Sequence, residues 1–119
     1  MKRLGMIVMF ALVAAPAWAM TAVKDESQFR LLVQGKDLVT RQMLVSITVR
    51  VHADGTITGG ALGGDITGTW VWQDGYFCRQ MDWGGRDIPY NCQLVEWDGS
   101  KLRFTTNRGD GDSADFRLR

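Results

Sequence analysis

The fold is indicated first by residues 45–58, which read VSITVRVHADGTIT. Apolar residues alternate with polar ones over the stretch Val45–Val51, and this period of two is typical of a β-strand with one buried face. An Asp-Gly pair, which is a strong hairpin signal, follows before the apolar pattern resumes at Ile57. We therefore predict two antiparallel strands joined by a three-residue loop, Ala53–Gly55, with Val51 opposite Ile57.

The same Asp-Gly pair recurs twice, and we expect three-residue loops there as well, Gln73–Gly75 and Trp97–Gly99. The first loop would place Trp72 opposite Tyr76, and the second would place Leu94 opposite Leu102. These pairings keep apolar side chains on one face, which is how register is normally set. The side chains expected to face the core are then Trp70, Trp72, Tyr76, Cys78, Cys92, Leu94, Leu102 and Phe104.

The chain has two cysteines, Cys78 and Cys92, and an even count favours a disulfide in an oxidising compartment. We predict that they bond across neighbouring strands whose turn lies near Trp83–Asp87. Such a bridge closes a loop of about 15 residues and would stabilise the domain by about 3 kcal/mol. Metal ligation and a redox pair are the alternatives, but two cysteines and one distant histidine are a poor zinc set, and no Cys-x-x-Cys is present.

One helix is expected over residues 25–35, ahead of the strands. Asp25 is suited to be its N-cap, Gly35 can end it, and Phe29, Leu32 and Val33 form one apolar stripe. We therefore predict a mainly β fold, a small antiparallel up-and-down barrel or curved sheet of about seven strands with one N-terminal helix. The helix would either plug one end of the barrel or cover its outer face.

The N-terminus predicts export. Two basic residues, Lys2 and Arg3, precede a short apolar run and an Ala-x-Ala site that ends at Ala19, which is the order found in a secretory signal peptide. We expect residues 1–19 to be removed and residues 20–119 to form a single domain in the periplasm or outside the cell. The alternative is an uncleaved membrane anchor, but the apolar run is shorter than the roughly 20 residues that span a bilayer.

Charge and composition argue against several partners. Without Lys2 and Arg3 the net charge falls from +1 to −1, so no basic excess remains to bind nucleic acid or anionic lipid. The glycine-rich stretch 59–64 lacks the Lys-Ser/Thr of a phosphate-binding loop. Residues 109–114 match the letters of a dinucleotide fingerprint, but almost no chain follows to form the required helix and strand. We therefore expect no cofactor.

The sequence gives only weak signals for catalytic or metal-binding residues. The single histidine, His52, is expected on a polar face with no marked nucleophile or orienting acid, so we predict no catalytic residue. Three acids, Asp110, Asp112 and Asp115, have calcium-like spacing, but the Glu that completes an EF-hand loop is missing. A hairpin turn is the preferred interpretation, with a weak surface calcium site as the alternative.

The central strands carry large apolar residues on the face predicted to lie outside. An antiparallel sheet often leaves one face in water, so aromatic residues there indicate either a contact surface or a covering helix. The barrel mouth near Trp83–Asp87 is a second place for such a surface. The candidate binding surface comprises Phe77, Arg79, Met81, Trp83, Arg86 and Trp97.

Three stretches carry a resemblance to known proteins: residues 68–72, residues 74–79 and residues 91–93, which read GTWVW, DGYFCR and NCQ. With the turn at residues 108–113, they resemble a family of small exported bacterial proteins of unknown function, some of which bear the name dihydrodipicolinate reductase. That name implies a nicotinamide-dependent enzyme of lysine synthesis. The chain has no N-terminal βαβ unit for the nicotinamide cofactor, so the sequence does not support this activity.

A weaker likeness, carried by Gly68-Thr69-Trp70, is to lipocalin-like inhibitors of bacterial metalloproteases. It implies that the N-terminal segment Met20–Lys24 enters a protease active site. Our first hypothesis is instead an exported, non-enzymatic binding or interaction module, whose partner is a protein or small molecule of the periplasm. The inhibitor is the second hypothesis and an enzyme the third.

Overall fold

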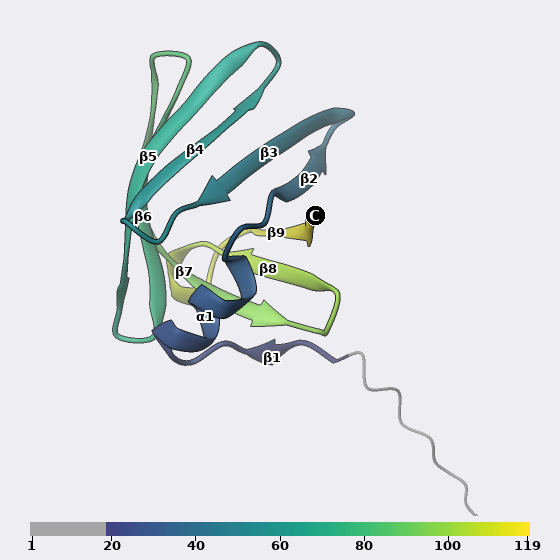
Figure 1. Cartoon of the computed structure of the whole chain (residues 1–119), viewed down its shortest axis with the longest axis vertical. Coiled ribbons are helices and arrows are strands. Elements are labelled where there is room, and N and C mark those ends of the chain that lie inside the picture. The colour runs from purple at the N-terminus through teal and green to yellow at the C-terminus, as the bar shows by residue number, and fades with distance from the viewer. Residues whose placement is uncertain (1–18) are drawn as a thin grey trace, which may run out of the picture.

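The computed structural model describes residues 19–119, and the predicted signal peptide lies almost entirely outside this part of the chain. In this part of the chain, strands dominate, and one α-helix precedes most of them (Figure 1). In chain order the elements are β1 (Thr21–Ala22), α1 (Glu26–Val33), β2 (Leu38–Gln42), β3 (Val45–Val51), β4 (Thr56–Ala61), β5 (Gly64–Gln73), β6 (Tyr76–Trp83), β7 (Arg86–Trp97), β8 (Lys101–Thr105), the 3₁₀ turn η2 (Asn107–Gly109) and β9 (Ser113–Leu118).

The strands β2 to β9 form a closed antiparallel barrel. Each pairs with the next along the chain, and β9 pairs back with β2. The predicted up-and-down barrel is therefore confirmed, with eight strands in the ring. A ninth strand, β1, continues the edge of β7 beyond the end of β6. The sequence pattern missed β2 because its five residues, LVTRQ, are too few for an alternation to stand out.

Helix α1 closes one end of the barrel, so the first of its two expected placements is correct. The Asp25 side chain accepts a hydrogen bond from the backbone N–H of Gln28, which is the predicted N-cap. The Phe29 side chain is fully buried, with its ring centroid 5.1 Å from those of Trp72 and Phe77. Figure 1 shows α1 at the end of the barrel remote from the β4–β5 hairpin.

The β3–β4 register is as predicted, with Val51 opposite Ile57. The β5–β6 register is not, because Trp72 lies opposite Phe77 and not opposite Tyr76. The loop is two residues long, and both Asp74 and Gly75 have positive φ, which matches the twist of a tight hairpin. A one-residue change in register moves side chains to the other face of the sheet. Phe77 and Met81 are therefore on the inner face of β6, and Tyr76 and Cys78 are on the outer face.

The β7–β8 register also differs from the prediction, since Leu94 lies opposite Thr105 and Trp97 lies opposite Leu102. The loop has three residues, as predicted, but it starts one residue later, at Asp98, whose carboxylate accepts hydrogen bonds from the backbone N–H groups of Ser100 and Lys101. Val95, which would have faced outward if its neighbour Leu94 faced the core, is fully buried. Leu94 is on the outer face, where it contacts η2.

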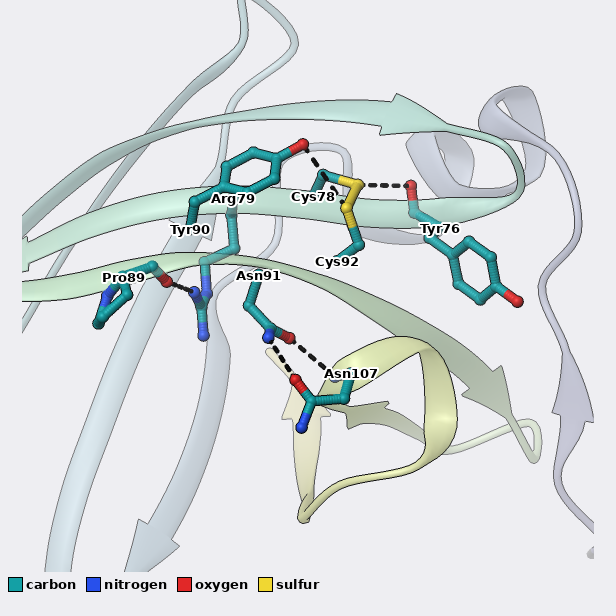
Figure 2. Close-up of a disulfide and its surroundings, with 8 residues drawn as sticks. All are labelled: Tyr76, Cys78, Arg79, Pro89, Tyr90, Asn91, Cys92 and Asn107. Atoms are coloured by element: carbon teal, nitrogen blue, oxygen red, sulfur yellow. Dashed lines mark hydrogen bonds between the residues drawn. A yellow bond between two sulfur atoms is a disulfide. The ribbon is translucent and has the colours of Figure 1, made fainter.

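The predicted disulfide is confirmed. Cys78 and Cys92 lie directly opposite each other on β6 and β7, and their sulfur atoms are bonded (Figure 2). The turn between them falls at Gly84–Gly85, within the expected segment. The pair lies on the outer face, opposite the half-exposed Val71, and not on the core face as the sequence pattern predicted.

Candidate binding cavity in the barrel

The barrel encloses a cavity of about 370 Å³. Ligand pockets typically occupy about 300–1,000 Å³, so this volume suits a small molecule. Inward-facing residues of strands β2 to β9 line it, and most are aliphatic or aromatic. Its floor includes Phe104, whose ring centroid is 5.4 Å from that of Phe77 and 5.3 Å from that of Phe116. Phe29 of α1 packs beneath this floor, so the helix closes the cavity at that end.

Three hairpin turns surround the other end of the barrel: Met43–Leu44, Leu62–Gly63 and Gly84–Gly85. Figure 1 shows the β2–β3, β4–β5 and β6–β7 hairpins extending away from α1. Met43, Leu44 and Leu62 are 95%, 88% and 74% exposed, and all three have positive φ. Large apolar residues are rare in that backbone conformation. The open end is therefore rimmed by exposed apolar side chains, and their residues adopt a backbone conformation that is unfavourable for them.

Trp83 forms part of the cavity wall near this end. Its indole N–H donates a hydrogen bond of 3.0 Å to the carbonyl of Ala61 on β4. A Cβ on Gly64 would come within 3.0 Å of the same indole nitrogen, so glycine lets β5 pass the ring. The Arg86 guanidinium lies over the Trp83 ring, 5.5 Å from its centroid. These contacts explain one glycine of the glycine-rich stretch without a phosphate ligand.

Three polar residues of the cavity wall are buried: Arg79 on β6, Gln93 on β7 and Thr40 on β2. The Arg79 guanidinium donates one hydrogen bond, from Nη1 to the carbonyl of Pro89 at 2.7 Å (Figure 2). Burial lowers the pKa of this guanidinium. The β6–β7 wall therefore carries a buried cation and an amide in a cavity whose lining is mostly apolar.

The structure reassigns the candidate binding surface from the outer to the inner face. Four of its members, Phe77, Arg79, Met81 and Trp83, line the cavity. Trp97 packs against the core, and Arg86 is exposed beside Trp83. The outer-face placement is wrong because it followed from a three-residue loop before Tyr76, where the actual loop has two residues. A two-residue Asp-Gly turn, assumed at that point, would have placed these side chains inside.

His52 lies where the chain leaves β3, and its ring nitrogen Nε2 is 2.7 Å from the hydroxyl of Thr58. The nearby Asp54 carboxylate accepts hydrogen bonds from the backbone and hydroxyl of Thr56, which lower the pKa of Asp54. Asp54 thus stabilises the turn, and it does not orient the imidazole. Among residues 19–119, the hydrogen bonds of His52 do not link it to a nucleophile and an acid in the way that a catalytic triad requires.

The three acids with calcium-like spacing are not brought together. Asp115 on β9 pairs with Arg103 on β8, with 2.7 Å between Oδ1 and Nε. Asp110 and Asp112 lie in the connection between η2 and β9. Within residues 19–119, no three His, Cys, Asp or Glu side chains form a group that could hold a metal ion. In the same part of the chain, no helix is long and apolar enough to cross a bilayer.

The N-terminal segment, Met20–Lys24, is part of the fold. Thr21 and Ala22 pair with the end of β7, and the Val23 side chain is 1% exposed. The backbone N–H of Val23 donates to the carbonyl of Val95 at 2.9 Å. To enter a protease active site, this segment would have to leave β7 and expose Val23.

No protein-family model, no curated protein and no solved structure matches the chain. The barrel and its cavity are therefore the basis for any statement about function.

Proposed function

We propose that this protein is an exported, non-enzymatic binding module that holds a small apolar molecule inside its barrel. The observation that carries the proposal is the cavity of about 370 Å³, lined mainly by apolar side chains and floored by packed phenylalanines. Concave, mostly apolar sites with a few placed polar groups are the usual form of small-molecule binding sites. The proposal narrows our first hypothesis, because the ligand enters the barrel and does not dock on its outer face.

Transfer of an apolar molecule from water into this cavity is the driving force we expect. Burial contributes about 25 cal/mol for each Å² of apolar surface removed from water. The cavity wall is built on strands of a closed barrel, so the site is formed before the ligand arrives. Binding then costs little ordering of the protein itself.

The proposal also places the protein outside the cytoplasm. The order of basic, apolar and small residues in the first 19 positions supports export. The Cys78–Cys92 disulfide supports an oxidising compartment, where such bonds persist. A ligand-binding barrel in that compartment would shield an apolar molecule from the surrounding water.

A fluorescence titration tests the proposal. The neutral probe N-phenyl-1-naphthylamine should gain intensity on mixing with the protein, with saturation at one probe per barrel, and decanol should displace it. Ala61→Phe, which adds a ring to a buried cavity-lining position, should weaken probe binding at least tenfold. Val71→Phe, on the exposed face of β5, is the matched control and should bind normally.

Failure of the unsubstituted protein to bind the probe or any apolar competitor would overturn the proposal. So would equal binding by a correctly folded Ala61→Phe variant, because the probe would then bind elsewhere. Circular dichroism and a thermal melt of each variant separate loss of binding from loss of the fold.

A further inference from the structure

Arg79 is buried in the cavity wall with most of its hydrogen-bonding capacity unused. The residue is 9% exposed, and a guanidinium carries five N–H donors. The structure gives it one acceptor, the Pro89 carbonyl. Among residues 19–119, no Asp or Glu oxygen lies within 4 Å of it. Buried arginines are normally paired, because an uncompensated charge in a low-dielectric site is costly.

Gln93 lies beside Arg79 on the inner face of the same hairpin. Across β6 and β7, Arg79 is opposite Asn91 and Phe77 is opposite Gln93, so Arg79 and Gln93 are diagonal neighbours. Gln93 is 8% exposed and lines the cavity. In the described part of the chain, its side-chain amide has no hydrogen-bond partner, although buried polar side chains nearly always have one.

The rest of the lining is mostly apolar, and its other polar side chains carry no positive charge: Thr40, Gln42, Thr106, Asp112 and Ser113. Opposite this pair, Leu38 and Ile47 come from β2 and β3, and the floor is formed by phenylalanines. The cavity therefore combines one cationic patch, formed by Arg79 with Gln93, and a larger, mostly apolar surface. A molecule that satisfies both parts has an apolar body and one compact polar group.

We propose that the barrel binds a monocarboxylate with an apolar body, such as a medium-chain fatty acid, and that Arg79 and Gln93 hold its carboxylate inside the cavity. This inference rests on the proposed function and adds the chemical class of the ligand. The planar guanidinium matches the two oxygens of a carboxylate, and the Gln93 amide can donate a further hydrogen bond. Apolar walls strengthen these interactions by lowering the local dielectric constant.

A single negative charge fits the site better than a phosphate. One guanidinium balances one charge, and within residues 19–119 the other ionisable side chain that lines the cavity, Asp112, is acidic. A second negative charge on the ligand would meet repulsion from Asp112 with no second cation to offset it. The class proposed is therefore a monoanion, and a phosphate monoester should bind more weakly.

Three probes of equal chain length and different head group test the inference: decanoate, decanol and decyltrimethylammonium. Their ability to displace N-phenyl-1-naphthylamine is measured at pH 7.5 with the unsubstituted protein. We expect decanoate to bind at least tenfold more tightly than decanol, and decyltrimethylammonium to bind most weakly. One good charge-assisted hydrogen bond accounts for a difference of this size.

Arg79→Met removes the charge and keeps an apolar side chain of similar length. It should weaken decanoate binding by about ten- to a hundredfold and leave decanol within about threefold. Arg117→Met, at an exposed position of β9, makes the same change in net charge and should alter neither affinity. Without ligand, the Arg79→Met variant should melt at the same temperature as the unsubstituted protein or higher, because a buried unpaired charge is gone.

The outcomes separate this inference from the proposed function. If decanoate and decanol compete equally while the probe binds in the barrel, the carboxylate site is wrong and the apolar-ligand function stands. If no probe binds at all, the proposed function itself fails. A clear loss of thermal stability in Arg79→Met would show that Arg79 supports the fold and does not serve a ligand. An equal effect of Arg117→Met would assign the preference to net charge, and both results would overturn the inference.

Discussion

Asp37 and Arg119 exchange two backbone hydrogen bonds, each of 2.9 Å, although they are 82 positions apart in the chain. The Asp37 carboxylate also accepts hydrogen bonds from Arg50 on β3, which hold the pKa of Asp37 below its ordinary value. This contact continues the short β2–β9 pairing that closes the ring. The barrel is therefore closed by the last residues of the chain.

Deletion of Leu118 and Arg119 should lower the free energy of unfolding by about 2–4 kcal/mol, because it removes the closing backbone bonds and the packed Leu118 side chain. Arg119→Ala keeps the backbone and removes only an exposed ion pair with Asp37, so it should cost less than about 0.5 kcal/mol. Urea denaturation measures both. Equal effects of the two changes would mean that the seam is not closed through the backbone.

Phe29→Ala should destabilise the protein by about 3–5 kcal/mol. The ring is fully buried and contacts Trp70, Trp72, Phe77 and Phe104 at the end of the barrel. Leu31→Ala, in the same helix at a position 76% exposed, is the matched control and should stay within about 0.5 kcal/mol. A small effect of Phe29→Ala in denaturant titration would argue against a helix that plugs the barrel.

The Met43–Leu44 turn offers a stabilising substitution. Both residues have positive φ, at 49° and 72°, and both side chains are exposed. Replacement by Asn and Gly suits that conformation and should raise the free energy of unfolding by about 1–2 kcal/mol. Gly75→Ala makes the opposite change, because it places a side chain at a position with φ 86°. It should lower the free energy of unfolding by about 1 kcal/mol. The turn geometry would be wrong if the Asn-Gly variant unfolded at the same or lower denaturant concentration.

The Arg103–Asp115 pair predicts an acid dependence of stability. A hydrogen bond from Arg103 lowers the pKa of Asp115 in the folded protein. A carboxyl whose pKa is lower in the folded state contributes stability above its unfolded pKa of about 3.9, and this contribution is lost as pH falls through the folded value. Because the pair is partly exposed, Asp115→Asn should cost at most about 1 kcal/mol at pH 7. Melting temperatures of both proteins should converge as pH falls below about 4, whereas a gap that widened in acid would contradict this sign.

Removal of the disulfide should cost about 3 kcal/mol, as expected for the loop between Cys78 and Cys92. The double variant Cys78→Ala, Cys92→Ala tests this in urea without a reductant. Thiol titration of the unreduced, unfolded protein should find no free thiol. If this titration found two free thiols in protein that was well folded before it was denatured, the β6–β7 register around residue 78 would be disproved.

Local signals in the sequence were sufficient for most of the architecture. The alternation in β3, the Asp-Gly pairs and the Asp25 cap act over a few residues, so their consequences do not depend on the rest of the fold. The cysteine pair added one long-range contact, and it placed β6 against β7 correctly. The sequence pattern did not predict strand β2, so the part of the cavity wall that this strand provides was also missed.

Register was harder, because the central strands carry apolar residues on both faces. In β5 and β6, Val71 and Tyr76 face outward while Trp72 and Phe77 face inward, so composition does not distinguish the two faces. The length of the hairpin loop determines which face points inward, and an Asp-Gly pair is compatible with a two- or a three-residue loop. The one-residue error moved the candidate surface from the interior to the exterior.

The sequence by itself determined an antiparallel meander with a capped helix and one disulfide, since these follow from interactions between near neighbours along the chain or between two cysteines. Only the tertiary structure decided which face became the interior, that the helix closes the barrel, and that Arg79 and Gln93 are buried in an apolar cavity. The physical reason is that burial is a property of the closed ring: a side chain is inside only when strands distant in sequence meet around it.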